Sequence, residues 1–252
     1  MDSARFQRLI DHAPLFPPAS MALEEALAED RAARESGCGW MLNRFVCPAS
    51  MLPELPADIP PLSVVLDQEL VAPAEAVEVR LSQPRPQSTE LLLAAQALRS
   101  LSAEVYFELV LGERWRDTVP AAIGAIAAVG GRVKLRCGAE AVPSCEQVAL
   151  VLLSCARAGV AMKATAGLHR ALRHGGHHGF LNLLCAAALV QCRGAGAPEL
   201  ERVLAEEDVG GLPLSDFTEE EWAAVRTRLF TTFGSCSWRE PADDLRQLGL
   251  IE

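Results

Sequence analysis

Lysine is nearly absent from this sequence. The 252-residue chain has 23 Lys and Arg residues, and only two of them, Lys134 and Lys163, are lysines. Tyrosine occurs once, at Tyr106. Long hydrophobic runs are also missing, because the longest, within residues 179–190, is shorter than the ~20 apolar residues of a membrane-spanning helix. The sequence therefore predicts no membrane partner.

Basic residues are fewer than acidic ones, 23 Lys and Arg against 33 Asp and Glu. The net charge of −10 argues against a nucleic-acid or anionic-membrane partner, since both require a basic surface. The first 16 residues carry charge and no apolar core, unlike a secretory signal peptide. The eight cysteines include no CxxC pair, so we interpret them as buried thiols rather than disulfides or metal ligands. Together these absences predict a cytoplasmic protein.

The chain is long enough for one large domain or two small ones, and its composition, 50% hydrophobic and 22% charged, is that of a globular protein. Residues 1–37 are predicted to form an N-terminal helical extension. It contains an amphipathic stretch at 2–12, a proline-rich break and a helix capped by Ser20. Residues 38–252 are predicted to form the main domain.

Strand-like segments recur at a fixed interval in the main domain. The segments VEVRL, VYFELVLG, VKLRCG and AMKATAG begin at residues 77, 105, 133 and 161, each 28 residues after the last, with Ala- and Leu-rich stretches of helical length between them. Such repeated strand–helix units build parallel sheets with right-handed crossovers. Earlier strands are predicted within 40–46 and 61–67 and a late one within 233–238, which leaves open whether the last third completes the fold.

Polar residues alternate along these strands, two positions apart, so that each pair points to one face of the sheet. The pairs are Glu78 and Arg80, Tyr106 and Glu108, Lys134 and Arg136, and Lys163 and Thr165. In an open sheet these charges would lie under helices without compensation, which costs several kcal/mol each. In a barrel they face the lumen, where opposite charges meet and the upper layer opens to solvent. We therefore predict an α/β fold of the TIM-like (β/α) barrel type.

The two lysines occupy corresponding lumen positions on neighbouring strands. Two ammonium groups in a desolvated lumen lower each other's pKa, and a neutral amine can attack a carbonyl to form a Schiff base. Two alternatives stay open. Lys134 and Lys163 could act as permanent cations in an isomerase or decarboxylase, or the lumen charges could form a structural network in a non-catalytic ligand-binding barrel.

Two segments, VKLRCG and GVAMKATAGLH, resemble the two-lysine pattern of class I deoxyribose-phosphate aldolases. The resemblance implies that Lys134 carries the Schiff base and that Lys163 lowers its pKa. Arg136–Cys137 replaces the small hydroxyl residues of that pattern, and Ala166–Gly167 replaces its phosphate-binding glycine pair. The segments KATAGLH, HGFLN and FGSCSW also resemble a bacterial family of barrel-like proteins, and this second resemblance implies a fold without a function.

A basic, histidine-rich stretch follows Gly167. It lies in a segment, between Glu146 and Glu199, that contains no Asp or Glu. We expect it to bind a phosphate or carboxylate group. A metal shared by His174 and His177, or by His169 and His174, comes second, because no acidic residue is near in the sequence and arginines are interleaved with the histidines. The predicted ligand-binding residues are Arg136, Thr165, Gly167, His169, Arg170, Arg173, His178 and Asn182. No metal or other cofactor is predicted.

Few acidic residues face the predicted lumen. Asp67 ends a strand, where barrel active sites lie, and Glu108 lies on the strand beside Lys134, so both are predicted to be catalytic together with Lys134 and Lys163. For Glu78 we favour a structural ion pair. The sequence thus predicts an aldolase-type lyase acting on a small anionic carbonyl compound, and it leaves open whether the protein forms a homo-oligomer.

Overall fold

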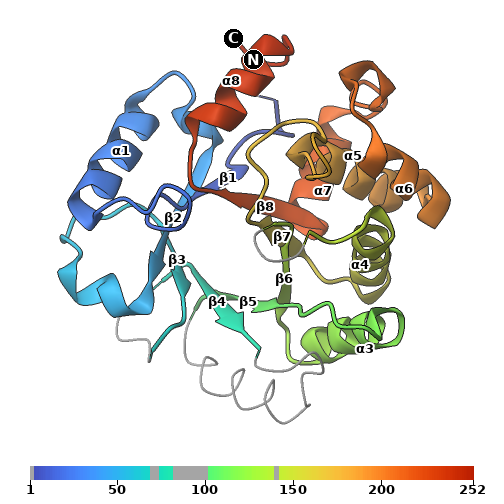
Figure 1. The fold of residues 1–252 in the computed structure, drawn as a ribbon, viewed down its shortest axis with the longest axis horizontal. Helices are drawn as coiled ribbons and strands as arrows, with labels where there is room; N and C mark the ends of the chain where they lie inside the picture. Colours follow the sequence, from blue (N-terminus) through green and yellow to red (C-terminus); the bar gives the residue numbers. More distant parts are fainter. Residues whose placement is uncertain (1–2, 69–73, 82–101, 139–141) are drawn as a thin grey trace.

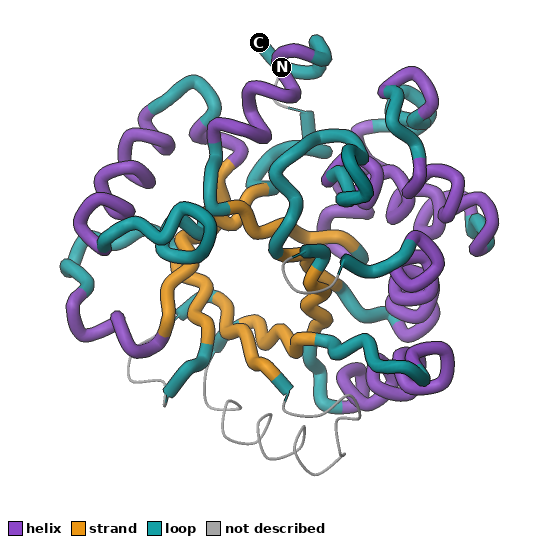
Figure 2. The backbone as a smooth tube through the Cα atoms, in the orientation of Figure 1, coloured by secondary structure: helices purple, strands orange, loops and turns teal. Residues whose placement is uncertain are grey.

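Eight parallel strands close into a barrel in the computed structural model, which describes residues 3–68, 74–81, 102–138 and 142–252 (Figures 1 and 2). The strands are β1 Ile10–His12, β2 Leu42–Pro48, β3 Leu62–Val65, β4 Ala76–Arg80, β5 Glu104–Glu108, β6 Arg132–Arg136, β7 Met162–Thr165 and β8 Phe230–Ser235. Each strand pairs with the next in sequence, and β8 pairs with β1. The predicted TIM-like barrel is confirmed, and its last third completes the closure.

Helices surround the strands on the outside of the barrel, as Figure 2 shows. They are α1 Leu23–Glu35, α3 Trp115–Ala128, α4 Cys145–Ala158, α5 Phe180–Ala188, α6 Ala197–Ala205, α7 Glu219–Arg228 and α8 Arg239–Gln247. Shorter turns are the 3-10 helices η1 Gly39–Met41, η2 Ala49–Glu54 and η4 Val209–Gly211 and the π-helix η3 Leu189–Arg193. Within the described ranges, each helix is too short or too polar to cross a membrane.

Local sequence signals account for the bounds of several helices. α4 begins at a capping box in which Ser144 and Gln147 exchange hydrogen bonds, and it ends at Gly159 with a left-handed φ of 65°. α7 begins at a second capping box, between Thr218 and Glu221, and runs almost directly into β8. The late strand predicted within 233–238 is present, and it begins earlier, at Phe230.

The N-terminal segment requires a correction. We predicted that residues 2–12 form an amphipathic helix in a helical extension over 1–37, but residues 10–12 form β1, which lies between β2 and β8. All three residues of β1 are buried, although two of them are polar, because Asp11 faces the lumen and His12 contacts Asp30 of α1. A boundary at residue 37 would separate β1 from both of its partner strands. Residues 10–35 are thus the first strand–helix unit of the barrel.

The alternation of side chains along the strands is also confirmed. In β6, Val133 and Leu135 are fully buried and pack in the main hydrophobic core together with residues of α3 and α4. The intervening Lys134 pairs with Glu78 of β4 across the lumen. β4 to β7 thus present polar and charged side chains to the lumen, and β6 is apolar on its helix-facing side, which is why the barrel suits this sequence better than an open sheet.

Arg226 binds backbone groups on both sides of the junction between β8 and β1. Burial lowers the pKa of Arg226 to about 10, so the guanidinium stays charged at neutral pH. It donates hydrogen bonds to carbonyl oxygens before β1 and within β8, namely those of Arg5, Gln7, Arg8, Phe230 and Thr231. Arg226 therefore links the two strands that close the barrel.

We predict that Arg226→Ala destabilises the protein by roughly 3–5 kcal/mol, because several backbone carbonyls lose a charged donor at once. Denaturant unfolding measures the change. The matched control is Arg157→Ala, which removes an exposed arginine near the end of α4 and should cost less than about 1 kcal/mol. Equal losses in the two variants would show that Arg226 does not contribute to closure.

Candidate active site

Five charged side chains from five strands meet inside the barrel. We call Asp11, Glu78, Glu108, Lys134 and Lys163 the lumen network. Lys163 Nζ donates to Asp11 Oδ2 and, at 2.6 Å, to Glu78 Oε1. Lys134 Nζ lies 2.8 Å from Glu78 Oε2 and 2.9 Å from Glu108 Oε2. The carboxylate of Glu78 thus joins the two lysines, one on each oxygen.

Lys163 is a permanently charged member of the lumen network. Burial alone would lower the pKa of this fully buried amine, but the carboxylates of Asp11 and Glu78 raise it well above the ordinary value. The expectation that the two lysines lower each other's pKa is therefore wrong for Lys163. The physical reason is that carboxylates, not the second ammonium group, are its nearest charged neighbours.

Glu78 responds to the same contacts in the opposite direction. Burial raises the pKa of a carboxyl group, yet Lys134 and Lys163 together lower the pKa of Glu78 far below its usual range. The side chain is 2% exposed and stays ionised at any pH near neutrality. Our preference for a structural ion pair at Glu78 agrees with this geometry.

Neutral polar groups hold the carboxylates of the lumen network in place. Thr232 Oγ1 donates to Asp11 Oδ2 at 2.9 Å, and Asn43 Nδ2 donates to Asp11 Oδ1 at 2.8 Å. Ser63 Oγ donates to Glu78 Oε1 at 2.7 Å. Each buried oxygen of Asp11 and Glu78 has at least one donor, which is the condition for keeping charges in a protein interior.

Lys134 differs from Lys163 in its access to solvent. A cavity of about 960 Å³ opens at the carboxyl ends of the strands, and its lining includes four members of the lumen network: Glu78, Glu108, Lys134 and Lys163. The side chain of Lys134 is 8% exposed, whereas that of Lys163 is 0% exposed. Of the two amines, Lys134 is thus the one that a molecule in the cavity can reach.

The two predicted catalytic acids lie in different places. Glu108 contacts Lys134 directly, and Arg80 Nε lies 3.8 Å from its other oxygen at the cavity rim. Asp67 also lines the cavity, but its carboxylate accepts hydrogen bonds from the backbone N–H and hydroxyl of Ser50, which lower its pKa. Asp67 therefore links η2 to the end of β3. Of the two predicted catalytic acids, only Glu108 contacts a lysine.

The predicted ligand-binding residues divide into two groups. Six of the eight line the cavity: Arg136, Thr165, Gly167, His169, Arg170 and His178. The other two do not. Asn182 uses its amide to hold the backbone of Arg173 at 2.9 Å and the carbonyls of Val203 and Glu206, each at 2.8 Å. Arg173 reaches Cys145 instead. Both residues support the loop from outside the cavity.

The loop after Gly167 is less positive than its own sequence indicates. We expected no acidic residue near it, but α8 supplies two. Arg170 pairs with Asp244 at 3.0 Å, and His169 Nδ1 lies 3.2 Å from Glu240. These carboxylates are more than 60 residues away in the chain, so a local scan of charge could not find them.

Two buried polar atoms in the cavity lining have no hydrogen-bond partner in the described structure: Thr165 Oγ1 and His178 Nδ1. His178 Nε2 donates to the carbonyl of Pro143 at 2.7 Å, and burial lowers the pKa of the ring, so Nδ1 is an acceptor at neutral pH. An acceptor does not bind an anion. This geometry does not favour an anion at His178, and its free nitrogen suits a hydroxyl donor.

Gly167 has a packing role that its sequence context did not indicate. Its φ is 70°, and a Cβ at this position would lie 2.9 Å from the carbonyl oxygen of Cys137 and the Cα of Gly138. The turns after β6 and β7 therefore approach each other at a distance that only glycine permits.

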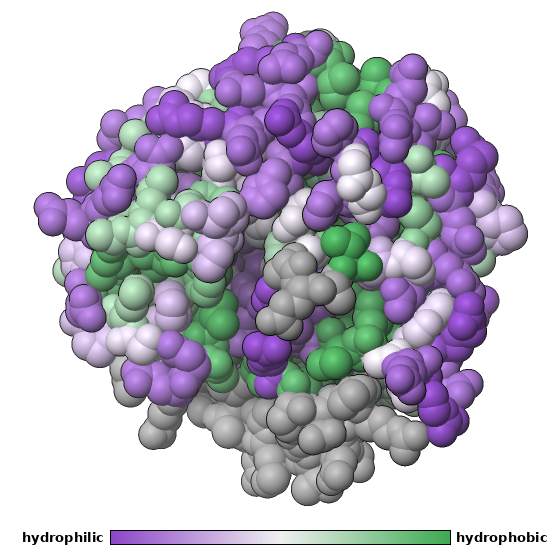
Figure 3. Space-filling model, in the orientation of Figure 1, coloured by the Kyte–Doolittle hydropathy of each residue, from purple (hydrophilic) through white to green (hydrophobic). Residues whose placement is uncertain are grey.

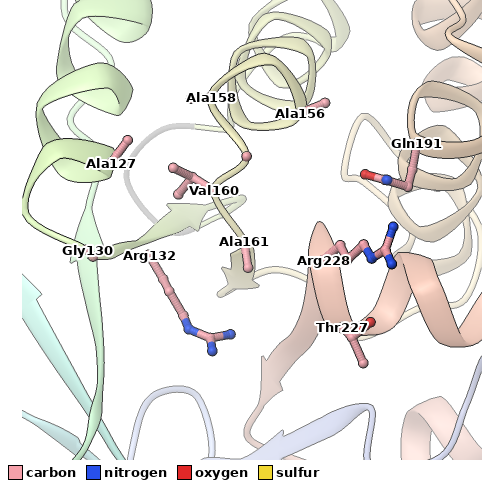
Figure 4. A pocket seen from close by; sticks show the side chains of 12 residues that line it. Ala127, Gly130, Arg132, Ala156, Ala158, Val160, Ala161, Gln191, Thr227 and Arg228 are labelled. Atoms are coloured by element: carbon pink, nitrogen blue, oxygen red, sulfur yellow. The ribbon is translucent and has the colours of Figure 1, made fainter.

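A second, smaller cavity of about 490 Å³ lies where several strands begin, at the end of the barrel away from Lys134 (Figure 4). Arg132, Gln191, Thr227 and Arg228 line it. Arg132 is engaged with Glu104 at 2.7 Å. Because barrel active sites form at the carboxyl ends of the strands, the larger cavity is the candidate site.

The fold and the lumen network define a (β/α) barrel with charged groups below an open cavity. No protein-family model and no curated protein matches the sequence. Among solved structures, the chain is similar to a deoxyribose phosphate aldolase from Aeropyrum pernix, which is described as having a unique tetrameric structure. The TM-score is 0.58 at 15% identity, over 98% of this chain and 94% of that chain. At this identity the similarity shows the fold alone.

We predict that Lys163→Met destabilises the protein by roughly 3–5 kcal/mol, because Asp11 and Glu78 lose a buried partner. The pKa of Glu78 in the folded protein is lowered, so its contribution is complete above the unfolded pKa of ~4.3 and is lost as the pH falls below it. The difference between wild type and variant should therefore be largest above about pH 5 and shrink toward pH 2. Urea unfolding across this range measures it.

The comparison variant is Lys134→Met. It leaves Glu78 with Lys163 and leaves Glu108 with Arg80, so its loss of stability should be smaller. A larger loss for Lys134→Met, or a difference for Lys163→Met that does not change with pH, would contradict the assigned roles.

Proposed function

We propose that the protein is an aldolase-type lyase that acts on a small anionic carbonyl compound through a Schiff base on Lys134. One observation carries the proposal: the amine of Lys134 lies at the cavity floor between two carboxylates, beside a second lysine that is fully buried and charged. The barrel shared with a deoxyribose phosphate aldolase and the two-lysine segment support it.

Formation of the Schiff base requires Lys134 to lose a proton. Glu108 is the suitable acceptor, because Glu78 is already shared with Lys163 and is held ionised by both lysines. The neutral amine then attacks the carbonyl carbon to form a carbinolamine, and a proton moves from its nitrogen to its oxygen. The carbinolamine hydroxyl then takes the proton from Glu108 and leaves as water. The product is an iminium ion on Lys134.

The iminium ion supplies the driving force for carbon–carbon cleavage. A base removes the proton of a hydroxyl two carbons from the imine carbon, the carbon–carbon bond breaks, and its electron pair moves to the iminium nitrogen as an enamine. The hydroxyl carbon leaves as an aldehyde. Protonation of the enamine and addition of water then release the second carbonyl product and restore Lys134.

In this proposal Lys163 is a positioning residue. Its charge is balanced by Asp11 and Glu78, and it fixes Glu78 next to Lys134. This role replaces the one implied by the family resemblance, in which the second lysine lowers the pKa of the first.

Arg136 is the strongest candidate for the anionic group of the substrate. It follows Lys134 by two residues on the same face of β6, lines the cavity and makes no ion pair within the described part of the chain. The unpartnered hydroxyl of Thr165 lies on the neighbouring strand, at the position paired with Arg136. A cation and a free hydroxyl together suit a phosphate or carboxylate.

The first prediction of the proposal is reductive trapping at Lys134. Incubation with small phosphorylated or carboxylated aldehydes and ketones plus borohydride should add mass at Lys134 and leave Lys163 unmodified, because only Lys134 is reachable. Mass mapping has few sites to separate, since the chain has only two lysines, and the N-terminal amine is the remaining group to exclude. Lys134→Arg should abolish trapping, because arginine cannot give up its proton.

Glu108→Gln tests the proton acceptor and should slow trapping at neutral pH by about 10²-fold or more, the usual size of a general acid–base contribution. The absence of trapping at Lys134 with every carbonyl compound would contradict the proposal. The second candidate function, an isomerase or decarboxylase with both lysines as fixed cations, would then be favoured by the raised pKa of Lys163.

The second prediction concerns the anion. Phosphate or sulfate should raise the melting temperature of the wild-type protein, because a ligand that binds only the native state stabilises it. In Arg136→Ala, the same rise in melting temperature should require at least about tenfold more anion. Arg157→Ala, which lies outside the cavity, should leave it unchanged. Stabilisation that survives Arg136→Ala would assign the anion to other groups.

A further inference from the structure

One side of the lumen differs in chemistry from the rest. On β3, Ser63 points into the lumen, where it donates to Glu78, so Val65, two residues later, has the same orientation nearer the cavity mouth. On β2, Arg44 contacts Glu104, the first residue of β5, at the end of the lumen where the strands begin. Val46 follows Arg44 on the same face of β2 and lies nearer the cavity. The upper lumen of β2 and β3 is therefore apolar.

These valines lie outside the two clusters of packed hydrophobic residues. Val46 is 5% exposed, yet neither Val46 nor Val65 packs in either of the two hydrophobic cores. Phe16, in the segment after β1, is likewise outside both cores. All three line the cavity, together with Pro17, Pro18 and Leu66. We call these six residues the apolar wall.

The charged side chains lie on the other strands of the barrel. The cavity lining includes charged side chains from β4 to β7, whereas the apolar wall comes from the ends of β1 to β3. The charged residues are Glu78, Arg80, Glu108, Lys134, Arg136 and Lys163. Figure 1 places β2 and β3 across the lumen from β6 and β7, and in Figure 3 hydrophilic atoms lie within the central hollow, with hydrophobic atoms at its edge. A molecule in the cavity thus contacts two unlike surfaces.

Hydroxyl groups have few partners at the apolar wall. Its six side chains carry no hydrogen-bond donor or acceptor, and the neighbouring carboxylate of Asp67 is engaged by Ser50. A polyhydroxylated chain bound there would leave its hydroxyls without protein side-chain partners, whereas an apolar group would lose contact with water and gain contact with carbon.

We propose that the ligand of this cavity is amphipathic: an aryl or branched alkyl body lies against the apolar wall, and an anionic group lies on the β6–β7 side near Arg136. This deepens the proposed function, which places the carbonyl carbon at Lys134. The substrate class is thus an aryl- or alkyl-substituted anionic carbonyl compound rather than a sugar phosphate.

Binding of two phosphate monoesters tests the proposal without any reaction. Phenyl phosphate and glycerol 3-phosphate have the same anionic group and differ in an apolar against a polyhydroxylated body, and neither contains a carbonyl. Titration calorimetry on the wild-type protein should give phenyl phosphate at least about tenfold tighter binding.

The test variants are Val46→Thr and Val65→Thr, singly and together, because threonine keeps the shape of valine and adds a hydroxyl. They should reduce the preference for phenyl phosphate several-fold without weakening glycerol 3-phosphate. Val142→Thr is the control, since Val142 is an exposed hydrophobic residue that does not line the cavity. It should leave the preference unchanged.

Three outcomes would overturn the proposal: equal or tighter binding of glycerol 3-phosphate, no binding of either ester at millimolar concentration, or the same preference in Val46→Thr/Val65→Thr as in Val142→Thr. Failure of Schiff-base trapping is a separate result. A protein that prefers phenyl phosphate but traps no carbonyl compound would retain the amphipathic ligand and lose the lyase assignment.

Discussion

The carboxylate of Glu78, shared between two lysines, is the contact on which the rest of the lumen depends. Each oxygen serves a different ammonium group, so Glu78 connects β4 to β6 and β7 at once. Asp11 extends the connection to β1, and Glu108 extends it to β5. The interior that these strands enclose can contain charge because every charge has a partner of opposite sign within it. A sheet that did not close would separate these partners.

Much of this arrangement follows from the sequence, because it depends on periodicity. The 28-residue interval indicated repeated strand–helix units, and charges at alternate positions indicated a lumen, so β4 to β7 and the inward direction of Glu108, Lys134 and Lys163 could be predicted. β1 could not. It has three residues, too few to display a period of two, and its neighbours suit a short amphipathic helix. Asp11 was missed with it.

The remaining errors share a physical cause, which is that electrostatic contacts are made in space rather than along the chain. The segment around Lys163 contains no acidic residue for about 17 positions on its N-terminal side and more on the other, yet Asp11 and Glu78 surround the amine. Judged from the other lysine alone, the pKa of Lys163 was expected to be lowered, whereas the two carboxylates raise it. The same holds for Arg170 and His169, whose partners lie on α8.

Closure between β1 and β8 also has a consequence for synthesis of the chain. Asp11 leaves the ribosome early, whereas Lys163 is 152 residues behind it and Thr232, which also binds Asp11, is 221 residues behind. Until the last strand is made, the carboxylate of Asp11 has no complete set of partners and the lumen has an open edge between β7 and β1. Contacts of such long sequence separation form late. A nascent or truncated chain that ends before β8 would expose ionised groups and unpaired strand edges together. The lumen network, besides being a candidate site for chemistry, is therefore complete only in a chain that includes β8.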